Sequence, residues 1–283
     1  MLLTGCQSYS PKQVAPQSDV EYAHPEGVSL RLDVYTPRNI TNRVPVLVWI
    51  HGGAWKAGSR SPCPLAFMVK DGFAAVSIEY RFIDQAAFPA QLHDCKGAIR
   101  WIKANADRFN FDPERIAVFG ASAGGHLAAL LGTTAEVKDL EGDVGGNLSY
   151  SSKVQAICAF YPPTDLDRLI TNPASRTSPD SDIGKLLGAP LESNPDKAMR
   201  ANPITYITPN DTPFYILHGD KDRVVPLEQS VLLHEALLKN GVESNLFVVR
   251  DRGHGIGAPI AAARQIVKFL ERHLQTNAPE GKH

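Results

Sequence analysis

The sequence lacks the long apolar runs and the one-sided charge that mark membrane-spanning or nucleic-acid-binding chains. No apolar run in its 283 residues approaches the roughly 18 residues of a transmembrane helix, so we expect no span across a bilayer. The 29 lysines and arginines nearly balance 30 aspartates and glutamates and form no basic stripe, which argues against a nucleic-acid partner. No spacing of His, Asp and Glu suggests a metal, and nothing implies another cofactor. With 43% hydrophobic residues, the chain can build a sizeable core.

Cysteine is also scarce, and the spacing of Cys6, Cys63, Cys95 and Cys158 matches no zinc or redox motif. Cys158 lies in an apolar stretch and is expected to be a small buried hydrophobe. Cys63 and Cys95 could be bonded in an oxidising compartment, although free thiols are the favoured interpretation.

The surroundings of Cys6 suggest export. Leu3-Thr4-Gly5-Cys6 resembles the lipobox of bacterial lipoproteins, in which the cysteine is lipidated, although the five residues before it lack a basic region. Residues 8–18 are rich in Gln, Pro and Ser, as a flexible tether would be. We therefore predict a lipoprotein-like segment over residues 1–19, with an exported lipoprotein or periplasmic location; the cytoplasm is the alternative.

Strand and helix patterns alternate along the rest of the chain. We expect an antiparallel hairpin at 20–35, buried strands at 45–50, 73–80, 116–119, 154–161, 214–218 and 245–249, and helices at 88–109, 125–131, 227–240 and 259–274. Asp112-Pro113 should mark the turn before the central strand. This order specifies one α/β domain over residues 20–283, with a mostly parallel central sheet and helices on both faces. The irregular segment at 165–212, rich in Pro, Asn, Ser and Asp, is predicted to form a small cap.

The central strand leads into the motif Gly120-Ala-Ser122-Ala-Gly124, which a helix follows. A sharp turn between a strand and a helix forces its central residue into a strained conformation, which small neighbours permit. Such a turn displays the serine hydroxyl at the tip of the sheet. Ser122 is therefore the candidate nucleophile.

A serine nucleophile needs a histidine base and an acid that orients the base. In a parallel sheet, the loops after the strands meet at one edge, so we look there. His254 follows the strand at 245–249, and Asp222 follows the strand at 214–218. Asp220 is the competing acid, and Asp251 is too near His254 in sequence to approach its ring from behind.

Three other histidines receive structural interpretations. His51 and His218 stand at strand ends and are expected to bond neighbouring loops, and His126 is expected to pack within the helix after the serine.

Acyl transfer also needs hydrogen-bond donors for the developing oxyanion. One should be the backbone N–H of Ala123, and the glycine-rich loop His51-Gly-Gly-Ala-Trp55 should supply Gly53 and Ala54. The side chains expected to shape the substrate pocket are Trp55, Phe82 and Tyr161.

Taken together, His-Gly-Gly-Ala-Trp, Gly-Ala-Ser-Ala-Gly-Gly-His, His-Gly-Asp-x-Asp-x-x-Val-Pro and Gly-His-Gly resemble the esterase/lipase branch of the α/β-hydrolases over about residues 20–275. The likeness is greatest to bacterial feruloyl and acetyl-xylan esterase-like members and to arylformamidases. It implies the α/β-hydrolase fold, with Ser122, Asp222 and His254 as the catalytic residues. Lipases of the hormone-sensitive type usually carry a third glycine at the position of Ala54, so this loop is nearer the formamidase form.

The resemblance implies a serine carboxylic-ester hydrolase that needs no cofactor, forms an acyl-enzyme and acts on small or carbohydrate-linked esters. An arylformamidase-like amidase, a peptidase and a non-catalytic binding protein with the same fold are the alternatives.

Overall fold

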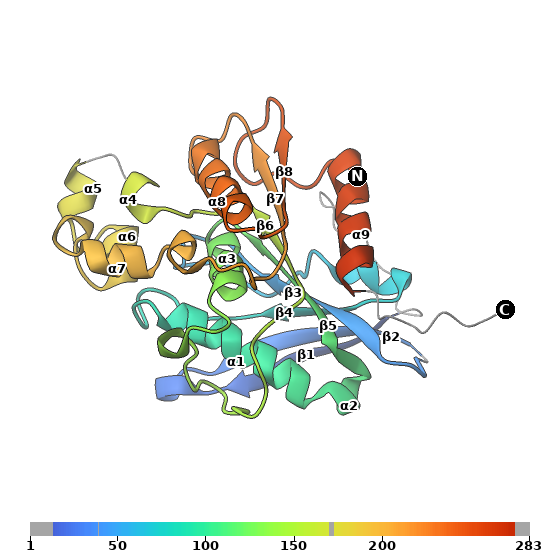
Figure 1. The fold of residues 1–283 in the computed structure, drawn as a ribbon. Helices are drawn as coiled ribbons and strands as arrows, with labels where there is room; N and C mark the ends of the chain where they lie inside the picture. Colours follow the sequence, from blue (N-terminus) through green and yellow to red (C-terminus); the bar gives the residue numbers. More distant parts are fainter. Residues whose placement is uncertain (1–13, 39, 170–172, 275–283) are drawn as a thin grey trace.

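The computed structural model describes residues 14–38, 40–169 and 173–274 (Figure 1). Cys6 lies outside the described residues, so its lipidation stays a prediction. Within the described ranges, no helix is long and apolar enough to cross a bilayer.

Within the residues that the structure describes, eight strands form one sheet in the order β1-β2-β4-β3-β5-β6-β7-β8. They are β1 (Val14–Ala23), β2 (Leu30–Pro37), β3 (Val44–Ile50), β4 (Ala74–Ile78), β5 (Phe111–Ala121), β6 (Ala156–Phe160), β7 (Phe214–Gly219) and β8 (Ser244–Val249). β2 pairs antiparallel with both β1 and β4, and every pairing from β4 through β3 to β8 is parallel. The predicted opening hairpin and mostly parallel sheet are confirmed, but the hairpin begins at Val14 rather than at residue 20. Residues 14–19, predicted to belong to a flexible tether, instead form part of β1, which pairs with β2, so that part of the prediction is wrong.

Helices cover both faces of this sheet, as predicted (Figure 1). The described α-helices are α1 (Ala90–Ala104), α2 (Ala106–Phe109), α3 (Ala123–Thr133), α4 (Leu166–Leu169), α5 (Pro173–Thr177), α6 (Asp182–Leu187), α7 (Pro195–Arg200), α8 (Leu227–Lys239) and α9 (Ile260–Leu274). β3 shows why both faces need cover: Val46 and Val48 pack with α1, α3 and α8, whereas Leu47 and Trp49 pack with α9. Successive side chains of a strand point to opposite faces, so an unbroken apolar run buries both.

One predicted turn is wrong. Asp112-Pro113 lies inside β5, which begins at Phe111 rather than near Ile116. The β3–β5 register shifts between Val44 and Val46, so residues 112–115 bulge out of the ladder. Proline cannot donate to a sheet ladder but is tolerated at a bulge, which explains why it does not end the strand.

Cys63 and Cys95 are not joined by a disulfide bond. Cys63, Cys95 and Cys158 are buried free thiols. Cys63 packs with the α9 face of the sheet and Cys95 with the α1 face, so the bond that an oxidising compartment could have favoured is absent from this pair. Burial raises the pKa of the Cys63 thiol to about 12, as expected for an unreactive thiol. The predictions of free thiols and of a buried Cys158 are confirmed.

Residues 165–212 lie beyond the carboxyl ends of the strands, beside α3 (Figure 1). They contain α4, α5, α6 and α7. Two buried side chains hold the segment, one at its start and one at Ala201. Gln229 accepts hydrogen bonds from the backbone N–H groups of Thr164 and Asp165, at 2.8 and 2.7 Å, and His126 Nε2 lies 2.7 Å from the carbonyl oxygen of Ala201. A role as a cap stays a prediction.

Candidate active site

Ser122 stands between β5 and α3 at φ 54° and ψ −121°, a left-handed conformation that costs a non-glycine residue about 1–3 kcal/mol. Its neighbours must be small. A Cβ on Gly120 would lie 2.1 Å from the carbonyl oxygen of Gly124, and a Cβ on Gly124 would lie 2.2 Å from that of Ile50. The expected strained turn is therefore present, and backbone crowding explains the two glycines.

The structure brings together the three residues singled out in the sequence. The Ser122 hydroxyl lies 3.0 Å from Nε2 of His254, and Nδ1 of His254 lies 2.7 Å from Oδ2 of Asp222. A carboxylate only accepts hydrogen bonds, so Nδ1 carries the proton and Nε2 is free to accept from the serine. The side chain of Asp222 is fully buried, whereas that of His254 is 22% exposed. This chain of hydrogen bonds can deprotonate the serine hydroxyl.

The loop after β7 selects Asp222 over its neighbours. The backbone N–H groups of Val224 and Val225 donate to Oδ1 of Asp222, at 2.8 and 2.9 Å, which leaves Oδ2 for His254. Asp220 and Asp251 are both exposed. The loop therefore fixes one carboxylate toward the histidine and leaves the two competitors in solvent.

His218 lies beneath this carboxylate. Its Nε2 is 2.8 Å from the carbonyl oxygen of Val225 and 3.3 Å from Oδ2 of Asp222, and its Nδ1 is 2.6 Å from the hydroxyl of Ser230. A carbonyl oxygen only accepts, so Nε2 carries the proton and Ser230 donates to Nδ1. Burial lowers the pKa of His218, which favours this neutral form. The predicted loop bonding is confirmed, but the approach to Asp222 was missed; the only sequence signal is their four-residue spacing.

The glycine-rich loop after β3 has three consecutive residues in left-handed conformations. Gly53, Ala54 and Trp55 have φ values of 117°, 51° and 57°. The carbonyl oxygen of Gly53 accepts hydrogen bonds from Lys56 and Ala57, both at 3.0 Å. Within the described part of the chain, no backbone acceptor pairs with the N–H of Gly53 or Ala54. These two N–H groups are therefore available to a ligand.

This loop packs directly against the serine turn. A Cβ on Gly52 would lie 2.7 Å from the carbonyl oxygen of Ala121 and 3.2 Å from Cβ of Ser122, so only glycine fits. Ala123 is the first residue of α3, and the first N–H groups of a helix have no partner within the helix. The predicted oxyanion donors thus come from two elements that touch beside the serine.

Two of the other histidines hold this loop. His51 is hydrogen-bonded through Nδ1 to the carbonyl oxygen of Gly52, at 2.8 Å, and its ring stacks on Tyr80. His126 is fully buried; Trp55 Nε1 donates to its Nδ1 over 3.2 Å. The structural interpretations of both histidines are confirmed. His126 therefore connects the glycine-rich loop, the serine helix and Ala201 of the 165–212 segment.

The predicted pocket residues differ in their access to the site. Trp55 is only 4% exposed and Tyr161 only 8%, with the Tyr161 ring centroid 4.7 Å from that of His254. Phe82 is half-buried, edge-on to His51. Direct contact of these side chains with substrate stays a prediction. Because Trp55 is buried, its replacement by alanine is expected to cost stability, and it does not cleanly test substrate preference.

Comparisons with known proteins identify the family of this chain. The family model described as BD-FAE matches residues 32–237. Esterase LipC of Mycobacterium tuberculosis is 34% identical over 203 residues, which make up 70% of this chain and 50% of LipC. The chain spans about half the length of the curated relatives it matches.

Solved structures extend the likeness to most of the chain. A truncated carbohydrate esterase from gut microbiota has a TM-score of 0.84 at 30% identity, covering 94% of this chain and 98% of that one. Esterase 2 of Thermogutta terrifontis, phosphonylated by sarin, has a TM-score of 0.75 at 26% identity, covering 90% and 94%. These likenesses confirm the predicted fold class.

Proposed function

Because the chain belongs to the BD-FAE family, within the esterase branch of the α/β-hydrolases, we propose that it is a serine carboxylic-ester hydrolase acting on small or carbohydrate-linked esters. The observation that carries the proposal is the hydrogen-bonded chain from Ser122 through His254 to Asp222, at 3.0 and 2.7 Å. The carbohydrate esterase from gut microbiota supports the sugar-linked part of the substrate class.

The reaction would proceed in two halves. Nε2 of His254 takes the proton of Ser122 as Oγ attacks the ester carbonyl, and the imidazolium then gives that proton to the departing alcohol. A water molecule, deprotonated by the same nitrogen, attacks the acyl-enzyme and releases the acid. Asp222 holds the histidine in the tautomer that accepts the serine proton and stabilises the imidazolium.

The tetrahedral oxyanion would be bound by the backbone N–H groups of Ala123, Gly53 and Ala54. Losing one donor of this kind typically costs about 100- to 1,000-fold in rate. The proposed donors are backbone groups on strained, crowded turns, so they would be in place before substrate binds and would need no reorganisation.

The arylformamidase-like alternative rests on one feature, Ala54 in place of a third glycine. It uses the same residues and differs only in the leaving group. Rates on a matched aryl acetate and aryl formamide distinguish the two, since an esterase would prefer the acetate.

The proposal is tested with p-nitrophenyl acetate, a fluorophosphonate probe and acetylated xylan. We expect the wild-type enzyme to hydrolyse the acetate and to be labelled, and Ser122→Ala to lose both properties while keeping its melting temperature. Labelling of Ser122→Ala, or wild-type protein inert to all three reagents, would contradict the mechanism and favour a binding protein.

The membrane anchor is a separate proposal, supported only by the Leu3-Thr4-Gly5-Cys6 sequence. In a bacterial host, the full chain should fractionate with membranes and Cys6→Ser should not. Equal distribution of the two forms would count against the anchor.

A further inference from the structure

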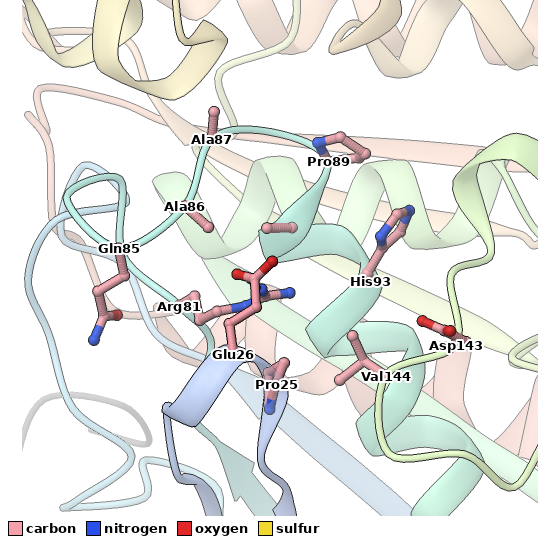
Figure 2. Close-up of a pocket in the computed structure, with 11 residues that line it drawn as sticks. Pro25, Glu26, Arg81, Gln85, Ala86, Ala87, Pro89, His93, Asp143 and Val144 are labelled. Atoms are coloured by element: carbon pink, nitrogen blue, oxygen red, sulfur yellow. The ribbon is translucent and has the colours of Figure 1, made fainter.

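A polar cavity of about 540 Å³ opens at the edge of the sheet, apart from the hydrogen-bonded chain of Ser122 (Figure 2). Ligand pockets typically measure about 300–1,000 Å³. Three segments line the cavity: the turn after β1 at residues 25–26, the loop after β4 and the first turn of α1 at 81–93, and residues 143–144. Figure 2 shows Glu26 and His93 both pointing toward the segment 86–89.

The topology places this cavity at the same edge as the candidate active site. β1 and β4 both run antiparallel to β2, so they share a direction, and β4 is parallel to β3. The turn after β1 therefore meets the loop after β4 where β3 and β5 end. That loop separates the two regions: Phe82 contacts His51, and the backbone N–H of Phe88 bonds the carbonyl oxygen of Leu186 at 2.7 Å.

The base of the cavity holds an ion-paired arginine, and the residues that line it include no spare cation. Arg81 donates from Nε and Nη2 to the buried Asp94 and from Nη1 to Glu26, at 3.0 Å. Arg81 is the only permanent cation among the eleven lining residues, and burial lowers the pKa of His93, which keeps that ring neutral. The Glu26 side chain is 75% exposed, and Asp143 is also exposed. Two accessible carboxylates facing one neutralised guanidinium disfavour a phosphate or carboxylate ligand.

The same lining suits hydroxyl groups. Carboxylates accept hydrogen bonds from hydroxyls, and the imidazole can both donate and accept. The oxygen of Gln85 accepts from the N–H of Phe82, at 2.8 Å, and its side chain points away from Glu26 and His93 (Figure 2). Pro25 and Pro89 offer apolar surface to the C–H faces of a ring.

We propose that this cavity binds an uncharged sugar of the substrate, one or more residues along the glycan from the sugar whose ester lies at Ser122. The inference rests on the proposed esterase function and specifies its substrate as an oligosaccharide ester. The glycan would cross the Phe82 loop between the two regions.

The test compares acetylated xylotetraose, acetylated xylose and p-nitrophenyl acetate on the wild type and on Glu26→Gln/Asp143→Asn. The wild type should have a kcat/KM about tenfold higher for the tetrasaccharide than for the monosaccharide, a gain that two or three hydrogen bonds can supply. The double variant should lose this gain through a higher KM, with kcat on p-nitrophenyl acetate unchanged within about twofold. Ala86→Trp, which fills the cavity without removing charge, should give the same result.

Asp107→Asn is the matched control. Asp107 lies in α2, away from the cavity, and its side chain is 91% exposed and paired with Arg43, much as Glu26 is exposed and paired with Arg81. The control variant should keep the full gain with chain length. An equal gain in wild type and in both cavity variants, with p-nitrophenyl acetate still hydrolysed, would overturn the sugar site alone. Inhibition by spermidine that the double variant relieves, without any chain-length effect, would overturn the sugar in favour of a cation. A wild type inert to p-nitrophenyl acetate would instead refute the proposed function.

Discussion

Asp94 and Asp222 are both aspartates with fully buried side chains, yet their surroundings differ in one decisive respect. Asp94 is paired with the guanidinium of Arg81, so its charge is cancelled in the resting protein. Asp222 is surrounded by neutral donors: two backbone N–H groups and two histidines. A buried charge left without a permanent counter-ion is costly unless another group becomes charged beside it. In the proposed mechanism, that group is the imidazolium of His254.

Among the variants that test this comparison, Asp222→Asn should cause the largest loss of activity. The amide NH₂ would donate to Nδ1 of His254, which places the imidazole proton on Nε2, where it cannot accept from Ser122. We expect kcat to fall by about 10⁴-fold, with the melting temperature little changed. Asp220→Asn, in the same loop but exposed, is the control and should keep full activity. A loss below about tenfold in Asp222→Asn would show that the carboxylate is structural, like Asp94.

Asp94→Asn should show the opposite pattern. It leaves the Arg81 charge buried without its main partner, which typically costs about 3–5 kcal/mol of stability. The activity per folded molecule should remain near wild type. Urea unfolding measures the loss, and Arg81→Met/Asp94→Leu, which removes both charges, should be less destabilised than Asp94→Asn. Equal destabilisation would mean that packing, and not the ion pair, accounts for the effect.

The buried neutral side chain of His126 should make the stability of the protein depend on pH. Burial lowers the pKa of His126 to about 4, against about 6.5 in an unfolded chain. Between these values the unfolded state binds a proton that the folded state does not, so stability falls as pH falls from about 6.5 to about 4. We expect this histidine alone to make the protein about 2 kcal/mol less stable at pH 5 than at pH 7.5. His126→Gln should reduce that difference in urea unfolding; an unchanged difference would assign the acid sensitivity elsewhere.

The smallest effect on activity is expected from changing His218, which lies beside the Asp222 carboxylate. His218→Leu removes one donor from Oδ2, so the carboxylate should attract the His254 proton more strongly. We expect kcat/KM to fall by about tenfold and its acid limb to move to higher pH, since a hydrogen bond to a charged group contributes about 1.5–3 kcal/mol. Ser230→Ala, which keeps the His218 ring, should shift the limb less. A lower kcat/KM with an unmoved limb would indicate only a packing role for His218.

How much could be predicted from the sequence depended on whether a feature is determined by residues close together in the chain. The serine turn and the glycine-rich loop are local motifs, because each depends on backbone conformations that only small or particular residues permit. The order Ser122, Asp222, His254 was predicted from the strands that each residue follows. The strands and long helices were likewise predicted from a local signal, the periodicity of apolar residues. The Asp112-Pro113 turn was wrong because a bulge between Phe111 and Ile116 accommodates these residues within β5.

Contacts between distant segments could be predicted for Ser122, Asp222 and His254, because each follows a parallel strand and the loops after such strands meet at one edge. Other contacts between distant segments could not be predicted in this way. The burial of Trp55 depends on His126, 71 residues further along the chain, and the sugar cavity joins residues near 26, 85 and 143. None of these residues carries a local pattern that names its partner. The approach of His218 to Asp222 depends on a loop conformation that four-residue spacing alone does not specify.

The anchoring of the 165–212 segment at two points has a practical consequence for engineering. Gln229 holds its start at Thr164 and Asp165, and His126 holds it again at Ala201, both from inside the core. A foreign insert grafted between residues 166 and 200 would leave both anchors in place. The stretch between them could then be replaced without redesigning the part of the fold that carries the serine.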